Sequence, residues 1–304
     1  MIFIRLSFHF GTVLKVCHFL FSLYYINQLQ LNIFIFRFLT TQFEMSAIED
    51  VKLVLKQPIE ISGQTDSMNI SGCDFLSIGH VLLADCIGEK QLMQHNSDGK
   101  HVKDIQLSNE PYDLTTIDSQ HIAVTYGVEG YIEIINIITD EVETIIKTGD
   151  RCLGISYFDG KLYTVVGWQA ILVTDLCGKT LTTIELYTDH AGCIATNKDG
   201  IVYSDFVNNT VTYCTFEGKR IWEFRSESVS FPRGLAFDNN QNVFVAGSDS
   251  NNVTIISRDG KTSRTVLTES NGLEYPRAVS FDKRHGLLLV CNVGNKKAAI
   301  FEVI

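Results

Sequence analysis

Short apolar runs separated by turn residues follow one another along most of the chain, and one such unit recurs. The stretches "FPRGLAFDNNQNVFVAG", from Phe231, and "YPRAVSFDKRHGLLLVC", from Tyr275, lie 44 residues apart. Each contains an aromatic residue, Pro-Arg, a small residue, a short apolar strand, Phe-Asp, a turn and a second apolar strand. A unit that returns at a fixed spacing indicates a repeat architecture.

The same unit can be followed along the chain through one small residue. With Gly234 as the reference, the equivalent positions are Gly72, Asp113, Gly154, Gly192 and Ala278. The spacings between successive positions, from Gly72 to Ala278, are 41, 41, 38, 42 and 44 residues. This pattern predicts six structural units with a period of about 40 residues.

Each unit shows the pattern of four short strands. An apolar strand follows the small residue, a turn rich in Asp, Asn, Gly or Ser comes next, and a second and third strand precede a more polar fourth. The expected second strands are residues 81–85, 122–126, 162–166, 201–205, 243–247 and 287–291. Almost no helical periodicity competes with these strands. The sequence therefore predicts an all-β protein, a six-bladed β-propeller of four-stranded blades.

The two ends of the repeat array are complementary. The sixth unit stops after its third strand, at "AAIFEVI", whereas residues 51–61 precede the first unit and have no blade of their own. Because an unpaired strand edge invites aggregation, we expect this N-terminal segment to supply the missing fourth strand and to close the ring.

The first 44 residues differ from the rest, and we treat them as an apolar N-terminal extension before a propeller domain at residues 45–304. Val16 to Phe36 contains no Lys, Arg, Asp or Glu, and its 21 residues are enough to span a bilayer. However, Asn27, Gln28, Gln30 and Asn32 lie in its middle, where amides without partners are costly. Three interpretations stay open: a mis-assigned start or disordered extension before Met45, a membrane anchor, and a signal peptide. Contact with a membrane is expected only if residues 16–36 are an anchor.

Charge and cysteine usage narrow the functional classes. The formal net charge is −10, and the first 44 residues carry +2, so the remaining 260 carry −12. An acidic body repels phosphate and argues against strong non-specific binding of nucleic acid. The eight cysteines form no C-x-x-C pair and no cluster with zinc-ligand spacing. Free thiols in apolar runs indicate a reducing compartment, and we expect a cytoplasmic protein.

The repeat pattern resembles NHL repeats, the six-bladed propellers at the C-terminus of many tripartite-motif proteins. The fifth and sixth units carry most of the likeness, with "FPRGLAFD", "NVFVAGSDSNNVTIISRDG" and "YPRAVSFD". The fourth unit also matches well, whereas the first three match less and place Asp113 where a small residue is usual. The resemblance extends over about residues 50–304.

This resemblance implies a recognition module without catalytic residues. Propellers of this family bind proteins, and sometimes RNA, on the face formed by the loops that lead into the inner strands. Their ubiquitin-ligase activity comes from an N-terminal RING zinc domain, and this sequence contains neither RING nor B-box motifs. We therefore expect a protein-binding scaffold, acting as a substrate-recognition element in a ubiquitin-ligase pathway. RNA binding on the same face is an alternative.

Six residues are predicted to form the ligand-binding face. Arg233 and Arg277 occupy the same place in two neighbouring units, just before the inner strand and near the mouth of the central channel. Their guanidinium groups are suited to gripping a carboxylate, a phosphate or a base, although Pro-Arg is also explained as turn chemistry. Tyr112 is equivalent in the second unit, and the loop after the second strand adds Tyr126, Trp168 and Phe206. Packing between blades is the alternative role for Trp168.

A calcium-dependent propeller hydrolase or lactonase is the second alternative. Asp74 and Asp113 lie in inner strands, but calcium needs several oxygen ligands at one point and the histidines do not recur at one repeat position. We predict no metal or other cofactor. Asn208 and Asn252 lie in N-x-T sequences, and their shared place between the second and third strands favours a role in turns over glycosylation.

Overall fold

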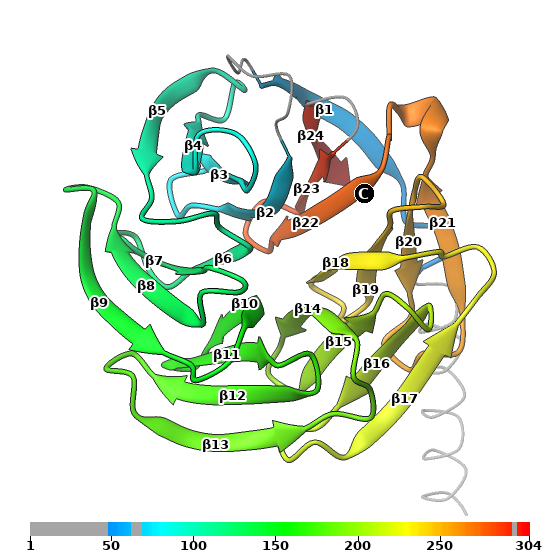
Figure 1. The fold of residues 1–304 in the computed structure, drawn as a ribbon. Helices are drawn as coiled ribbons and strands as arrows, with labels where there is room; N and C mark the ends of the chain where they lie inside the picture. Colours follow the sequence, from blue (N-terminus) through cyan, green and yellow to red (C-terminus); the bar gives the residue numbers. More distant parts are fainter. Residues whose placement is uncertain (1–47, 62–68, 294–296) are drawn as a thin grey trace, which may run out of the picture. The chain divides into compact units, whose positions relative to one another are not determined.

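The computed structural model describes residues 48–61, 69–293 and 297–304. In these ranges the chain forms six four-stranded antiparallel sheets around one axis (Figure 1). The prediction of an all-β, six-bladed propeller is therefore confirmed. The expectations for residues 1–44 lie outside the described residues. No helix in the described ranges has the length and apolar character needed to cross a bilayer.

Each sheet runs outwards from the channel in chain order, except that the sixth takes its outer strand from the N-terminal side. The inner strands are β2 (Ile70–Phe75), β6 (Asp113–Thr116), β10 (Cys152–Phe158), β14 (Ala191–Thr196), β18 (Pro232–Phe237) and β22 (Pro276–Asp282). The second strands are β3 (Val81–Asp85), β7 (His121–Thr125), β11 (Lys161–Val166), β15 (Ile201–Asp205), β19 (Val243–Gly247) and β23 (Leu287–Asn292). The third strands are β4 (Gln91–His95), β8 (Tyr131–Asn136), β12 (Ala170–Asp175), β16 (Thr210–Cys214), β20 (Asn252–Ile256) and β24 (Lys297–Val303). The outer strands are β5 (His101–Gln106), β9 (Glu141–Lys147), β13 (Thr180–Glu185), β17 (Arg220–Arg225), β21 (Ser263–Leu267) and β1 (Leu53–Glu60).

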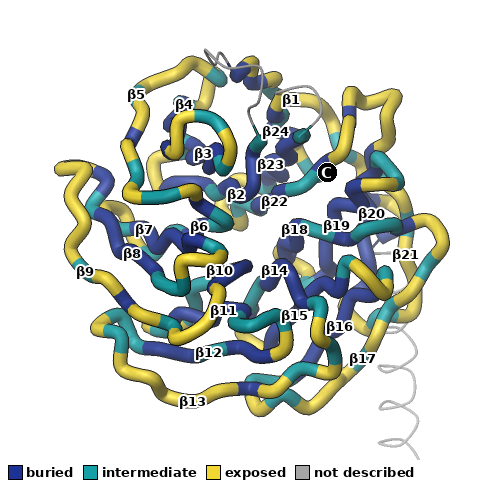
Figure 2. The backbone as a smooth tube through the Cα atoms, in the orientation of Figure 1, coloured by how far each residue is buried: buried dark blue, intermediate teal, exposed yellow. Residues whose placement is uncertain are grey.

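Burial changes along each blade in the way that the sequence pattern indicates. Every residue of β3, β15, β19 and β23 is buried, because these strands are covered on both faces by the neighbouring blades. The outer strands β13 and β17 are mostly exposed and correspondingly polar (Figure 2). The core is therefore a series of apolar layers between adjacent blades, which holds the inner strands rigidly around the channel.

Small residues at the reference position allow neighbouring inner strands to approach closely. A Cβ atom on Gly154 would lie 2.7 Å from the Cα of Cys193, and one on Gly234 would lie 2.7 Å from the backbone nitrogen of Val279. In the second blade Asp113 takes this position. Its carboxylate accepts a hydrogen bond from the backbone N–H of Ile155, on the next inner strand, at 3.1 Å.

Strand β1 is the outermost strand of the sixth sheet and pairs antiparallel with β24. The register runs from Leu53 opposite Val303 to Glu60 opposite Lys297, with an irregularity between Leu55 and Gln57. Ile59 is fully buried in the core that β1 shares with the first and sixth blades. How much this pairing contributes to the stability of the ring stays a prediction, which is developed in the Discussion.

Candidate functional site

Strand direction places two sets of loops at the same end of the channel. Because neighbouring strands are antiparallel, the segments that lead into the inner strands lie beside the loops that join the second and third strands. We call this end the arginine face and define it by Tyr112, Trp168, Phe206, Arg233 and Arg277. The contacts between these residues, described below, show that the structure brings all five together.

The aromatic-Pro-Arg motif is set by a repeated turn. Phe231 and Tyr275 have φ angles of 54° and 49°, in the left-handed region that residues with a side chain rarely adopt. The backbone N–H of Phe231 donates to the side-chain oxygen of Asn209, and that of Tyr275 donates to Asn251, both at 2.7 Å. The turn therefore fixes where Pro-Arg enters the inner strand.

The structure corrects the pairing of the asparagines by one residue. Asn209 and Asn251, rather than Asn208 and Asn252, are the equivalent turn residues, and both are left-handed, with φ of 54° and 49°. Asn208 instead donates to the carboxylate of Asp205, and Asn252 donates to the carbonyl of Ser228. The doubled Asn-Asn sequence concealed this shift, because either residue of each pair is suited to a turn.

Arg233 is held between two aromatic rings. Its guanidinium carbon lies 4.4 Å from the ring centre of Phe206 and 4.3 Å from that of Phe231. Each such contact is worth about 0.5–1 kcal/mol at a partly exposed site. Among the described residues, the guanidinium of Arg233 has no hydrogen-bond acceptor and no carboxylate within ion-pair distance. The rings therefore orient Arg233 and leave its N–H groups unused.

Arg277 and Tyr112 form a second contact of the same kind. The guanidinium carbon of Arg277 lies 5.8 Å from the ring centre of Tyr112, and one of its N–H groups donates to the side-chain oxygen of Asn69 at 3.1 Å. The Tyr112 hydroxyl has no hydrogen-bond partner within the described ranges. Burial raises the pKa of Tyr112, and the positive charges of Arg233 and Arg277 both oppose this shift. Both guanidinium groups thus act on the same hydroxyl.

Trp168 packs at the edge of this group. It has a left-handed φ of 73°, and its ring centre lies 5.4 Å from that of Phe206. The guanidinium carbon of Arg151 lies 5.9 Å from the Trp168 ring. His190 contacts the edge of Phe206, at 6.4 Å between ring centres. Phe231, Arg151 and His190 were not among the predicted site residues, although the recurrence of Phe231 as Tyr275 was a usable signal.

Tyr126 does not belong to the arginine face. Only 1% of its surface is exposed, its hydroxyl donates to the carboxylate of Glu133, and its ring stacks on Tyr131 with 4.7 Å between ring centres. The prediction placed Tyr126 at the end of the expected second strand, residues 122–126, and counted it with the face that the following loop forms. The structure places it in the core, where it cannot contact a partner.

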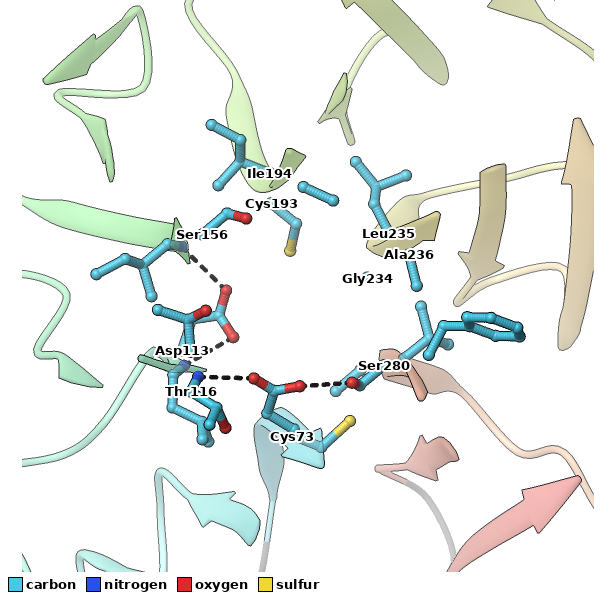
Figure 3. Close-up of a pocket in the computed structure, with 18 of the residues that line it drawn as sticks. Cys73, Asp113, Thr116, Ser156, Cys193, Ile194, Gly234, Leu235, Ala236 and Ser280 are labelled. Atoms are coloured by element: carbon cyan, nitrogen blue, oxygen red, sulfur yellow. Dashed lines mark hydrogen bonds between the residues drawn. The ribbon is translucent and has the colours of Figure 1, made fainter. Parts of the chain in front are cut away.

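A cavity of about 370 Å³ lies beneath the arginine face, inside the ring of inner strands. Figure 3 shows that side chains from different blades converge on it, with the sulfur of Cys193 pointing into the open space. Asp74 and Asp113 line one side, and Ser156 and Thr196 also contribute. The cavity is therefore polar, and its lining includes two carboxyl groups and the thiols of Cys73 and Cys193.

The two carboxyl groups join neighbouring blades. Asp74 accepts hydrogen bonds from the Ser280 hydroxyl at 2.6 Å and from the backbone N–H of Thr116 at 2.7 Å (Figure 3). Burial raises the pKa of Asp74, and these hydrogen bonds oppose the rise. Burial also raises the pKa of Asp113 to about 7; the backbone N–H bonds from Ile155 and Leu114 oppose this rise, Asp74 adds to it, and Arg277 opposes it. A carboxylate on one inner strand thus accepts a hydrogen bond from a backbone N–H group of the next inner strand.

This arrangement does not fit a calcium site. Both carboxylates are already used by backbone N–H groups or by Ser280, and calcium requires several further oxygen ligands directed at one point. Within the described ranges, no three His, Cys, Asp or Glu side chains are grouped so that they would hold a metal ion.

The raised pKa of Asp113 predicts a pH dependence of stability. In the unfolded chain its pKa is the ordinary 3.8, and in the fold it is about 7, so the fold is favoured by protonation. The stabilising effect is complete below about pH 4 and is lost as the pH rises to 7. We expect Asp113→Asn to flatten the stability profile over this range, by on the order of 4 kcal/mol.

Urea unfolding at several pH values measures this effect. Asp98→Asn, in an exposed turn, is the matched control and should leave the slope unchanged. A slope in Asp113→Asn equal to that of the unaltered chain would show that Asp113 ionises normally.

Comparison with known proteins shows the fold and not the family. No family model and no curated protein sequence matches the chain. A streptogramin B lyase structure superposes with a TM-score of 0.62 at 13% identity, over 83% of this chain and 98% of the lyase. A structural genomics protein of unknown function from Bacteroides thetaiotaomicron superposes with a TM-score of 0.67 at 11% identity, over 84% of this chain and 76% of that protein. The chain is therefore similar to β-propeller proteins in fold.

Proposed function

We propose that this protein is a recognition module that binds a partner protein through the arginine face. The observation that supports the proposal best is that Arg233 and Arg277 are oriented by aromatic rings and have no carboxylate partner in the described ranges. The sequence holds 35 acidic against 25 basic residues, so carboxylates are abundant elsewhere. Two guanidinium groups that have no carboxylate partner among the described residues are suited to acceptors supplied by another molecule.

The family resemblance supports the same surface. In NHL propellers the loops that lead into the inner strands bind partners, and here those segments carry Tyr112, Arg233 and Arg277. From this resemblance we further propose a cytoplasmic role as a substrate-recognition element in the ubiquitin pathway. The function requires no chemistry, because a rigid ring that presents side chains from several blades is sufficient for binding.

An enzyme is the second candidate, and one observation favours it. A carboxyl group with a pKa near neutrality, such as that of Asp113, can exchange a proton at physiological pH, and one structural neighbour is named a lyase. The two candidates depend on different residues. Recognition depends on Arg233 and Arg277, whereas proton transfer depends on Asp113. Retention of the full set of partners by Asp113→Asn is expected for a recognition module.

Reversal of the two charges tests the proposal. We expect the Arg233→Glu and Arg277→Glu double variant to recover at least about tenfold less of each specific partner from cell extract, measured by crosslinking and mass spectrometry. The charge-matched control is Lys261→Glu with Arg284→Glu, two exposed residues in turns at the other end of the blades. Recovery of the same proteins by the double variant would mean that binding takes place elsewhere.

A further inference from the structure

We infer that the arginine face holds a binding site for a carboxylate, formed by Arg233, Arg277 and the Tyr112 hydroxyl, which receives an acidic side chain of a peptide segment. This inference rests on the proposed function and specifies what the partner must present. It depends on hydrogen-bond donors from three different blades at the channel mouth: among the described residues, Arg233 and the Tyr112 hydroxyl have no acceptor, and Arg277 uses one N–H group on Asn69.

Most of these donors have no acceptor among the described residues, and they lie close together. Arg233 donates to no acceptor among the described residues, Arg277 donates through one N–H group to Asn69, and the Tyr112 hydroxyl has no partner. Arg277 lies 5.8 Å from the Tyr112 ring and Arg233 lies 4.4 Å from the Phe206 ring, and a Cβ atom on Gly192 would contact both Phe206 and the Tyr112 hydroxyl, so the three groups lie close together. A planar carboxylate accepts two parallel N–H bonds from a guanidinium group, and such charge-assisted pairs are the stronger hydrogen bonds.

Gly192 keeps this space open. A Cβ atom there would lie 3.5 Å from the Tyr112 hydroxyl oxygen and 3.1 Å from the Phe206 ring. Tyr112 belongs to the second blade and Gly192 to the fourth, so the tyrosine reaches across the channel mouth. The hydroxyl therefore lies near Phe206, on which Arg233 stacks, while Arg277 lies over the ring of Tyr112 itself.

The stacking of the arginines favours a carboxylate over RNA. RNA-binding surfaces stack bases on free aromatic faces. Here the guanidinium of Arg233 lies against both Phe206 and Phe231, and that of Arg277 lies over Tyr112. Arg151 lies over Trp168 in the same way. The rings thus orient cations, and the acidic body opposes an extended polyanion more than a single carboxylate.

Asp113 gives this site a measurable signature. Asp113 follows Tyr112 directly in the sequence. Its charge interacts with five ionisable groups: Asp74 and Cys73 of β2, Cys193 of β14, Arg277 of β22 and Tyr112. When ionised, Asp113 repels a bound carboxylate and competes for Arg277. When protonated, it does neither, so binding should strengthen as the pH falls from 8 to 6.

The test uses the full chain and a fluorescently labelled, C-terminally amidated hexaglutamate peptide as the probe. We expect binding that weakens at least about tenfold in Arg233→Ala and in Arg277→Ala, and no binding of the matched hexaglutamine peptide. Arg233→Lys and Arg277→Lys, which keep the charge and lose the planar fork, should weaken binding several-fold. Thermal unfolding of each variant shows whether it is folded. The affinity should rise from pH 8 to pH 6 in the unaltered chain and stay constant in Asp113→Asn.

Each contrary result has a distinct meaning. Absence of hexaglutamate binding, equal binding of hexaglutamine, or equal binding by folded Arg→Ala variants would overturn the carboxylate site. Tighter binding of a hexauridylate oligonucleotide at the same residues would replace it with an RNA site. If the charge-reversal double variant loses its protein partners while hexaglutamate fails to bind, the recognition surface stands and only the carboxylate assignment fails. If hexaglutamate binds and partners are recovered regardless, the site exists but the proposed partner surface is wrong.

Discussion

A chain that begins at Ser62 is expected to unfold at a far lower temperature than one that begins at Met45, and to aggregate. The shorter chain lacks β1, so β24 loses its antiparallel partner and exposes a row of N–H and C=O groups. It also lacks Ile59 and Ile61, which are buried between the first and sixth blades. Each contributes about 1.5–3 kcal/mol through burial, before the lost hydrogen bonds are counted. Calorimetry and size-exclusion chromatography measure the two effects.

Two substitutions on β1 test whether the buried side chains of the strand, and not only its backbone pairing with β24, stabilise the fold. Ile59→Ala should cost about 2–5 kcal/mol of unfolding free energy, because the side chain is fully buried. Leu55→Ala, on the same strand with 54% of its surface exposed, should change the unfolding free energy by less than about 0.5 kcal/mol. If the chain that begins at Ser62 proved as stable as the one that begins at Met45, the ring would not depend on β1 for closure.

Gly154→Ala is expected to destabilise the propeller by about 3 kcal/mol or more, an extreme case of overpacking. The added Cβ would lie 2.7 Å from the Cα of Cys193, 2.8 Å from the Gly192 carbonyl oxygen and 2.9 Å from the Ile194 nitrogen. All three are backbone atoms of the neighbouring inner strand, so no side-chain rotation relieves the contact. The blades must separate at the channel, and this disturbs the packing behind them.

Gly160→Ala is the control for this prediction. Gly160 lies in a turn with φ of 74°, and a Cβ there would meet nothing within 4 Å. Its substitution therefore measures backbone strain alone, about 1–2 kcal/mol. Chemical denaturation of both variants gives the comparison. A Gly154→Ala variant no less stable than Gly160→Ala would mean that the inner strands have room to move apart.

The repeat period was sufficient to predict the architecture. Six equivalent positions about 40 residues apart, five of them Gly or Ala, identified the blades, because each inner strand must tolerate the same close neighbour, as Gly154 and Gly234 now show. Three apolar runs and a more polar fourth per unit identified the strands, because burial between blades imposes the same pattern each time. The recurrence of Arg233 and Arg277 also placed both at one end of the channel, because equivalent repeat positions lie at equivalent heights.

The repeat pattern could not predict contacts between side chains of different blades. Tyr126 is buried in a core that contains Leu82 and Ile105 of the first blade, and the position of Tyr112 across the channel mouth depends on Gly192 and Arg277. The raised pKa of Asp113 depends on its burial beside Asp74. A repeating sequence specifies what each blade is, since its strands pair with near neighbours in the chain. Which side chains meet at the axis was decided only by closure of the ring, because that step brings together residues far apart in the sequence.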